Sequence, residues 1–260
     1  MDRAEILALM DLNMREMYRE DARATPGGFV VEREGLVLCG SPRGTVLTNM
    51  IMVAGRVSAH GVRRAFEETF GVHAMPCSVW TRAHADASLE DELRVAGFDE
   101  LMSVPGMTLP AAEAVAPPVP PKLRLGVVDD AAGRAAYARV MESAWEVYGI
   151  DPETTASHFA TLDSLVGPTK CAFIAWLDGV PVAGAVLYLS HGVGGIGWVG
   201  TVPAACGHGY GAAVTWAAIE EGARRGGVFS NLQASPLGVS VYRRMGFATS
   251  THYRVFVSRR

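Results

Sequence analysis

The chain has 260 residues, of which 49% are hydrophobic and 19% charged, a composition that can bury one large core or two modest ones. The formal net charge of −4 argues against nucleic acid or an anionic membrane as an obligate partner. No apolar run reaches the roughly 18–20 residues that span a bilayer. The chain also begins with charged residues in a helical pattern, not with the basic and then apolar order of a signal peptide. We therefore expect a cytoplasmic protein.

Residues 1–110 contain alternating helix and strand patterns. Apolar side chains recur at helical spacing from Ile6 to Met17, with Asn13 on the same face. Further along, the patterns predict strands at 29–31, 36–39, 49–54 and 77–80 and helices at 62–70 and 89–96, the last of which ends at Gly97-Phe98. Pro110 to Pro121 is rich in proline, which predicts a stiff extended spacer and a domain boundary at residues 111–121.

Residues 122–260 continue the alternation, which indicates a mixed α/β (α+β) fold. Asp151 before Pro152 is a candidate cap at the start of a helix, and Asp178-Gly179 is a candidate hairpin turn. The other predicted elements are strands at 123–127, 171–177, 180–189, 196–202, 228–234 and 253–257 and helices at 131–145, 209–225 and 236–245.

The stretch from Trp198 to Gly211 organises this second part. A short β-branched run ends at Pro203, whose missing N–H stops the ladder pairing. Three alternating glycines (Gly207, Gly209 and Gly211) follow, and then a good helix sequence. Glycines remove side chains that would block a ligand, and the first amides of a helix lack partners at the positive end of its dipole. Strand, glycine loop and helix start therefore predict a pyrophosphate cradle.

Three phosphate-binding patterns were compared with this stretch. A Walker loop is excluded, because no lysine follows the glycines. Residues 207–212 formally match a dinucleotide fingerprint, but the next predicted strand has Asn231 and no carboxylate to hold a ribose. The segment Cys206–Gly211 resembles the coenzyme A loop of the GNAT superfamily of N-acetyltransferases, with Cys206 where that family usually has Gln or Arg. Residues 231–247, N-L-Q-A-S-P-L-G-V-S-V-Y-R-R-M-G-F, resemble the second signature of the same family.

The resemblance implies a set of site residues. The Val202 amide would point at the thioester oxygen of acetyl-CoA, and Tyr242 would be the general acid that protonates the leaving thiolate. The residues expected to contact the coenzyme are Thr201, Val202, Gly207, His208, Gly209, Tyr210, Gly211, Ala212, Asn231 and Ser235. Tyrosine suits the acid role because its ordinary pKa near 10 keeps it protonated at neutral pH.

The general base is not evident from the sequence, because the strand before the glycine loop carries no carboxylate. Glu146, Asp151 and His191 are candidates, and an ordered water is the alternative. Three aromatic residues are candidates to line the acceptor pocket or simply to pack in the core: Trp145, Tyr148 and Trp198.

An internal repeat is a second prediction. Residues 78–107 echo residues 232–257, and Gly97-Phe98 corresponds to Gly246-Phe247. The pattern resembles tandem members of the family: two GNAT-like mixed-sheet halves, of which the C-terminal half has the splayed-strand acetyl-CoA site. Leu93 stands where the second copy has Tyr242, and the alternating glycines are missing around Gly61. We therefore expect residues 1–110 to be a degenerate half without a coenzyme site that shapes the acceptor cleft, and residues 122–260 to bind acetyl-CoA.

These features together predict an acetyl-CoA-dependent N-acetyltransferase that acts on an amine of a small molecule or peptide. A non-catalytic acetyl-CoA or CoA sensor and, less well supported, an NAD-binding oxidoreductase are the alternatives. Acyl donors longer than acetyl, the amine itself and the oligomeric state are left open by the sequence.

The cysteines (Cys39, Cys77, Cys171 and Cys206) have no C-x-x-C spacing and the histidines no H-x-x-x-H pair, so no metal is expected. Cys206 is the one thiol whose pKa a helix N-terminus is expected to lower.

Overall fold

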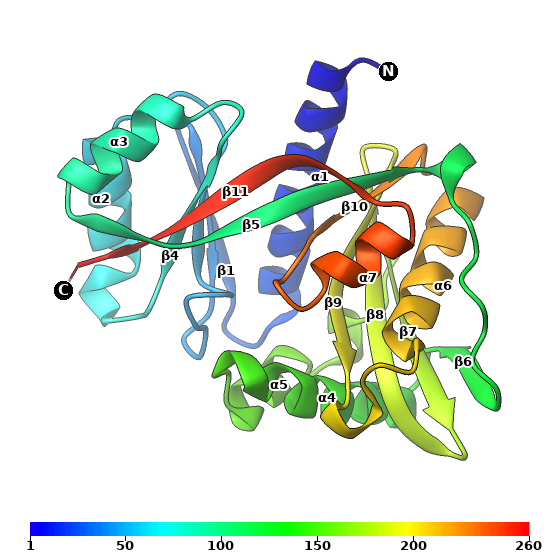
Figure 1. Cartoon of the computed structure of the whole chain (residues 1–260). Coiled ribbons are helices and arrows are strands. Elements are labelled where there is room, and N and C mark those ends of the chain that lie inside the picture. Colours follow the sequence, from blue (N-terminus) through cyan, green and yellow to red (C-terminus); the bar gives the residue numbers. More distant parts are fainter. Residues whose placement is uncertain (260) are drawn as a thin grey trace.

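A computed structural model describes residues 1–259 as a single eleven-stranded sheet with helices on both faces (Figure 1). The strand order is β1-β2-β3-β4-β11-β5-β10-β9-β8-β7-β6. The elements of the N-terminal part are α1 (Arg3–Ala24), β1 (Phe29–Arg33), β2 (Leu36–Gly40), β3 (Met50–Val53), α2 (Ala59–Thr69), β4 (Ser78–Arg82), α3 (Ala87–Val95) and β5 (Phe98–Pro110). Those of the C-terminal part are β6 (Leu123–Val127), α4 (Ala131–Trp145), α5 (Pro152–His158), β7 (Lys170–Leu177), β8 (Val180–Ser190), β9 (Val193–Thr201), α6 (Tyr210–Arg224), β10 (Phe229–Gln233), α7 (Val239–Arg244) and β11 (Ala248–Ser258).

Short 3-10 turns connect several of these elements. They are η1 (Gly71–His73), η2 (Ala111–Glu113), η3 (Glu146–Tyr148), η4 (Leu162–Ser164) and η5 (Pro203–Ala205). Within residues 1–259, no helix combines the length and the apolarity needed to cross a bilayer.

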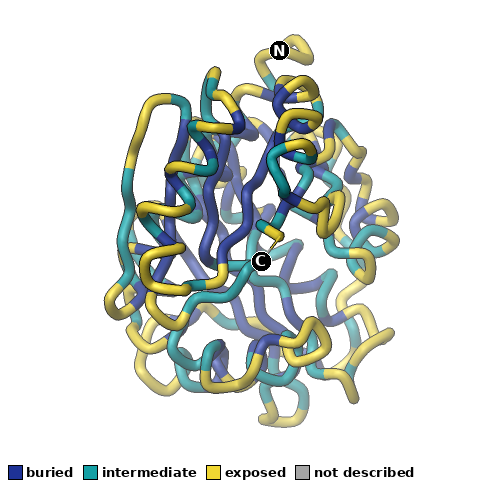
Figure 2. The backbone as a smooth tube through the Cα atoms, turned by 90° about the vertical axis from the view of Figure 1, so that its left-hand side faces the viewer, coloured by how far each residue is buried: buried dark blue, intermediate teal, exposed yellow. Residues whose placement is uncertain are grey.

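The sheet is buried on both faces because successive side chains in its strands enter different cores. In β7, Ala172 and Ile174 belong to the core beneath α1 and α4, whereas Phe173 and Ala175 belong to the core beneath α6 and α7. A third core lies between the N-terminal strands and the helices α2 and α3. The strands are accordingly the most deeply buried part of the chain, and the exposed residues are concentrated in helix surfaces and loops (Figure 2).

From β1 onward in the N-terminal part and from β7 onward in the C-terminal part, the elements follow the same order. Each has an antiparallel hairpin, a third antiparallel strand, a helix, a parallel strand, a short helix and a terminal strand. The terminal strands are exchanged: β5 lies beside β10, and β11 lies beside β4. Because β5 and β11 also pair with each other along nearly their whole length, they join the two parts into one sheet (Figure 1).

Every helix and strand predicted from the sequence is present, with differences in extent: α1 continues to Ala24 instead of ending near Met17, and β9 starts at Val193 instead of at residue 196. The last strand was predicted at 253–257 but starts at Ala248, because the polar residues before Tyr253 pair with β5. The helix predicted at 236–245 starts only at Val239, because the Gly238 and Val239 amides both donate to the Ser235 carbonyl and close a turn there. Asp151 caps α5 as expected, since its carboxylate accepts a hydrogen bond from the Thr154 amide at 2.8 Å.

A β-bulge in β9 sets the path of this strand toward the glycine loop. The register with β8 shifts between Gly184 and Val186, and Trp198 has a positive φ of 47°, which is strained for a bulky residue. The Trp198 carbonyl accepts a 2.7 Å hydrogen bond from the hydroxyl of Tyr137, a buried residue of α4. This bond satisfies a backbone group that the bulge removes from the ladder.

We predict that Tyr137→Phe lowers the free energy of unfolding by about 1–2 kcal/mol, because the partly buried Trp198 carbonyl loses its donor. Urea denaturation at neutral pH measures the change. Tyr210→Phe is the matched control, since its hydroxyl has no hydrogen bond within residues 1–259, and its effect should stay within about 0.5 kcal/mol. Equal effects in the two variants would show that the bulge does not depend on this bond.

Candidate functional site

The strands β9 and β10 separate at their carboxyl ends. They pair in parallel over only three residues each, from Val193↔Phe229 to Gly195↔Asn231. Beyond that point β10 stays on β5 as far as Gln233, and β9 stays on β8 as far as Thr201. The facing edges of the two strands therefore carry backbone groups that the partner strand does not satisfy.

The backbone amide of Val202 points in another direction than predicted. The Val202 amide donates to the Val182 carbonyl of β8 at 2.9 Å, so it is not free to contact a thioester. Because N–H groups alternate in direction along an antiparallel strand, the Thr201 amide instead faces the side where β10 diverges. The expected contact of the Val202 amide with a thioester therefore does not fit this hydrogen bond, whereas the Thr201 amide has the suitable orientation.

The glycine loop after β9 leaves a row of backbone donors. The amides of Ala205 and Cys206 are used within η5, and the first bonded amide of α6 is that of Ala213, which donates to the Gly209 carbonyl at 3.0 Å. Between them, the six consecutive amides of residues 207–212 have no acceptor within the described chain. Gly207 and Gly209 both have φ of +83°, a conformation that favours glycine. The loop can therefore offer several N–H groups to one anion at the positive end of α6.

The side chains of this loop are small or turned onto one another. The His208 imidazole stacks on Tyr210, with ring centroids 5.7 Å apart, and its Nδ1 lies 2.9 Å from the Cys206 carbonyl. Cys206 is exposed, whereas Cys39, Cys77 and Cys171 are buried free thiols. A Cβ at Gly207 would meet nothing within 4 Å, so the loop is open on that side.

Tyr242 lies on α7 next to the loop that follows β10. Its ring is buried, and it packs edge-on against Phe247 with centroids 5.8 Å apart. Burial, and secondarily the charge of the neighbouring Tyr148, raise the pKa of Tyr242 well above its ordinary value. The phenol is therefore protonated throughout the neutral range and can act only as a proton donor there.

The hydroxyl groups of Tyr148 and Ser235 form a hydrogen bond next to Tyr242. The Tyr148 hydroxyl, in η3 after α4, donates to the Ser235 hydroxyl at 2.9 Å, and the Gly238 amide lies 3.2 Å from the same oxygen. Ser235 thus lies beside Tyr242 and is in contact with the segment that follows α4, and its contact with the coenzyme stays a prediction.

The Asn231 side chain does not face the glycine loop. Strand alternation turns it to the α1 face of the sheet, while its neighbour Leu232 faces α6 and α7. There it is 1% exposed and donates to Asn13 Oδ1 at 3.3 Å. The side chain therefore does not point toward the glycine loop, because the sequence motif fixes the position along the strand and not the face. A contact of Asn231 with the coenzyme stays a prediction and would involve its backbone.

The three candidate bases are separated by the fold. His191 lies in the turn between β8 and β9, which is roughly 30 Å along the strand from Thr201, so it cannot act there. Asp151 caps α5, and hydrogen bonds from Thr154 lower its carboxyl pKa. Glu146 is exposed at the start of η3, in the same short segment as Tyr148.

A buried polar cluster near β9 was missed from the sequence. Asp21 of α1 accepts hydrogen bonds from the Tyr188 hydroxyl at 2.6 Å and from Trp198 Nε1 at 2.8 Å. His158 Nε2 of α5 lies 3.7 Å from the same carboxylate, and the imidazole packs against the Trp198 ring in a tilted arrangement, with ring centroids 4.3 Å apart. Asp21 gave no sequence signal, because an acidic residue near the end of a helix usually faces solvent.

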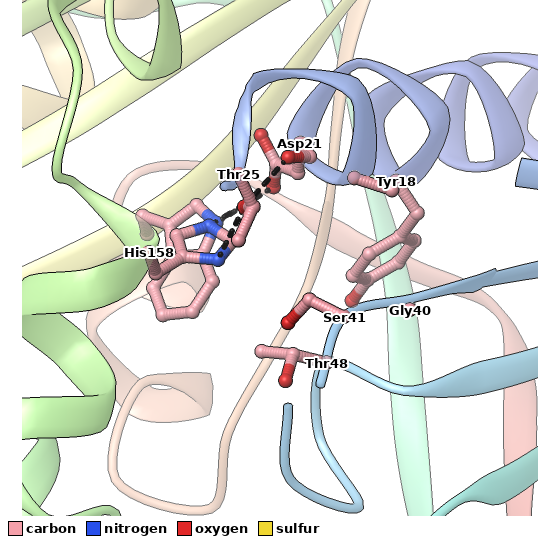
Figure 3. Close-up of a pocket in the computed structure, with 9 residues that line it drawn as sticks. Tyr18, Asp21, Thr25, Gly40, Ser41, Thr48 and His158 are labelled. Atoms are coloured by element: carbon pink, nitrogen blue, oxygen red, sulfur yellow. Dashed lines mark hydrogen bonds and ion pairs between the residues drawn. The ribbon is translucent and has the colours of Figure 1, made fainter. Parts of the chain in front are cut away.

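This cluster forms one wall of a narrow cleft between the two parts of the chain. Figure 3 shows Asp21, Thr25 and His158 on one side and Tyr18, Ser41 and Thr48 on the other. The cleft continues along α5, where the Thr155 hydroxyl is buried without a hydrogen-bond partner. An ion pair between Arg43 and Glu153 connects the β2–β3 loop to α5.

The charge state of Asp21 follows from its surroundings. Burial alone raises its pKa, but hydrogen bonds from His158 and Tyr188 and the charges of His158 and Lys170 outweigh burial, so the pKa lies below its ordinary value. The carboxylate is therefore ionised at neutral pH. Among the described residues, no three His, Cys, Asp or Glu side chains gather to hold a metal ion.

Comparison with known proteins relates the site to one family. Residues 137–247, which include α6, the glycine loop and Tyr242, match the acetyltransferase (GNAT) family. No curated protein matches the chain.

Solved structures with the same fold cover nearly the whole chain. A GCN5-related N-acetyltransferase from Kribbella flavida is 21% identical and superposes with a TM-score of 0.74 over 96% of this chain and 95% of its own. A GCN5-related N-acetyltransferase from Sphaerobacter thermophilus is 17% identical, with a TM-score of 0.61 over 86% of this chain and 80% of its own. A tandem GNAT protein from the clavulanic acid biosynthesis pathway is 12% identical, with a TM-score of 0.60 over 90% and 84%. At these identities the likeness is one of fold.

We predict that Asp21→Asn lowers the free energy of unfolding by about 2–3 kcal/mol at pH 7, because the network loses its charge. Since the folded pKa is below the ordinary value of about 3.9, this stabilisation is complete above that pH and is lost as the pH falls below it. The difference between wild type and variant should therefore shrink below about pH 4. Urea denaturation at pH 7 and pH 3.5 measures it, with Asp178→Asn in the exposed β7–β8 turn as the control. A difference that stays constant over this range would contradict an ionised Asp21.

Proposed function

We propose that this protein is an N-acetyltransferase that transfers an acetyl group from acetyl-CoA to an amine of a small molecule or peptide, since residues 137–247 match the acetyltransferase (GNAT) family. The observation that carries the proposal is the combination of two features. One is the row of six unpartnered amides at residues 207–212, and the other is the separation of β9 from β10 beside it.

The residues of the loop fit a diphosphate. Consecutive backbone N–H groups at a helix N-terminus bind phosphate oxygens through hydrogen bonds and the helix dipole. Gly207 leaves its side of the loop open, and a side chain at Gly211 would press on Thr201 Oγ1 at 3.0 Å. The diphosphate of coenzyme A would be held here, and its acyl arm would enter between the diverging strands, where backbone groups of β9 lack partners.

The proposed chemistry is direct transfer. The neutral amine nitrogen attacks the thioester carbonyl, a C–N bond forms and the C–S bond breaks. The Thr201 amide would stabilise the developing oxyanion, and Tyr242 would give its proton to the departing thiolate. The proton lost by the amine passes to water or to a base on the acceptor side. Acetyl-CoA supplies the activated acyl group, and the protein supplies orientation and the two hydrogen-bond donors.

We place the acceptor on the side of the sheet that carries α1, α4 and α5. Trp198, Trp145 and Tyr148 form a continuous aromatic row there, with successive ring centroids 4.9 and 5.3 Å apart. The row leads from the cleft between the two parts of the chain to Ser235 and Tyr242. The proposed acceptor site is therefore built by both parts, while residues 1–110 have no glycine loop at the start of α2 and serve to shape it.

The test of this function is thiol release from acetyl-CoA in the presence of a panel of amines, together with coenzyme A titration by calorimetry. Binding of the coenzyme with turnover of at least one amine, confirmed by an acetyl mass shift, is the expected result. Binding without turnover for any amine would favour a coenzyme A sensor, a role that the absence of a carboxylate on β9 also suits. Absence of coenzyme binding would refute both.

We predict that Tyr242→Phe lowers kcat by about 10²-fold or more and changes the Kd for acetyl-CoA less than threefold, because the ring packing is kept and only the proton donor is lost. Steady-state kinetics with an amine from the panel and calorimetry measure the two quantities. Phe247→Leu, which alters the packing partner of Tyr242 without removing a hydroxyl, is the control. Wild-type turnover in Tyr242→Phe would remove the assignment.

A further inference from the structure

Asn13 of α1 is fully buried at the point where β9 and β10 separate. Its Nδ2 lies 3.0 Å from the Tyr188 carbonyl and 2.9 Å from the Ser190 hydroxyl on β8, and 3.1 Å from the Val193 carbonyl on β9. Its Oδ1 accepts a hydrogen bond from Asn231 of β10 at 3.3 Å. One side chain thus connects three neighbouring strands of the sheet.

The Oδ1 of Asn13 lies at the last residue pair of the parallel ladder, whereas its Nδ2 reaches the Val193 carbonyl at the first pair. Asn231 pairs with Gly195, and no pairing of β9 with β10 follows. A Cβ at Gly195 would lie 2.1 Å from Asn13 Oδ1, so only glycine lets the amide reach this position. Two residues further, a Cβ at Gly197 would lie 2.9 Å from Met17 Sδ. Gly195 and Gly197 therefore allow side chains of α1 to approach the backbone of β9 closely.

This arrangement bears directly on the strand separation. Beyond Gly195, unpaired backbone groups on facing strand edges favour continued pairing, which would close the space that the acyl arm needs. Asn13 holds the ends of β8, β9 and β10 at fixed distances from α1, and the bulge at Trp198 directs β9 away further along. Helix α1 is supplied by the N-terminal part of the chain, and the coenzyme loop by the C-terminal part.

We propose that Asn13 is a positioning residue for the coenzyme site: it fixes the point at which β9 and β10 diverge, so that α1 of the N-terminal part controls coenzyme A binding by the C-terminal part. The proposal rests on the function proposed above. It assigns to residues 1–110 a role in the coenzyme site itself, in addition to the acceptor cleft.

The experiment measures the Kd for coenzyme A and the melting temperature in a set of single variants. Asn13→Ala removes the contacts of this side chain with β8, β9 and β10 and should weaken coenzyme A binding at least tenfold. Asn231→Ala removes only the bond to β10 and should weaken binding in the same direction by a smaller factor, which keeps the test available if Asn13→Ala does not fold.

Asp11→Asn is the matched control. Asp11 is equally buried, two residues earlier on α1, but its carboxylate contacts Tyr253, Arg82 and His84, on the side of β11 and β4. The variant should lower the melting temperature by an amount similar to Asn13→Ala and change the Kd less than twofold. Equal losses of affinity in Asp11→Asn and Asn13→Ala would overturn the proposal, because they would trace the effect to general destabilisation.

A double-mutant cycle tests the contact itself. Gly195→Ala should weaken coenzyme A binding because the new methyl group meets the Asn13 amide. In the double variant that amide is absent, so the Kd should be no weaker than in Asn13→Ala alone. If the fold-changes in Kd caused by the two substitutions simply multiply in the double variant, the Asn13 amide does not act through its contact with Gly195.

Hydrogen exchange separates this proposal from the proposed function. In Asn13→Ala, the amides of β10 and of the start of β9 should exchange faster than in the wild type, while those of β4 and β11 should not change. Asp11→Asn should show the reverse. This readout needs no coenzyme, so if the wild-type protein fails to bind coenzyme A, the function fails while the role of Asn13 at the strand junction is still decided. Unchanged exchange at residues 193–195 and 229–231 would refute it.

Discussion

The separation of β9 from β10 is the constraint on which the other features depend. A sheet is stabilised when its backbone groups pair, yet these neighbours pair over only three residues. The structure maintains the separation in three ways: β10 continues on β5, the bulge at Trp198 turns β9 aside, and α1 is fixed over the junction. The backbone donors left over at the end of β9 and in the glycine loop are those that a ligand can use.

The exchange of terminal strands explains how two similar parts act as one molecule. Because β5 reaches into the C-terminal part and β11 into the N-terminal part, neither part has a complete sheet without the other. The strand that holds β10 away from β9 is therefore itself supplied by the first 110 residues. The N-terminal part has no glycine loop at the start of α2, yet its strand β5 pairs with β10 and its helix α1 contacts the β8–β10 junction.

Helix α1 carries the polar groups that fix this arrangement. Asp11, Asn13 and Asp21 are all buried, and each binds a different region of the sheet: β11 and β4, the β8–β10 junction, and the Trp198 bulge. Buried polar groups of this kind are costly unless fully paired, so they favour one position of the helix over all others. The Trp198 bulge is held from both sides, by Asp21 through the indole and by Tyr137 through the carbonyl. Strain at φ 47° is thus offset by contacts from two helices.

The sequence by itself determined the elements, the glycine loop and the position of Tyr242, because hydrophobic periodicity, glycines and proline act locally along the chain. The family resemblance likewise rested on two short segments, and the match of residues 137–247 confirmed it. Only the tertiary structure decided which face Asn231 occupies, that the Val202 amide is already bonded to β8, and that Asp21 and His158 meet at Trp198. These depend on strand register, on a bulge at a non-glycine residue and on contacts between segments more than 100 residues apart, none of which has a local signal. The exchange of β5 and β11 is of the same kind, since a strand pattern does not specify its partner.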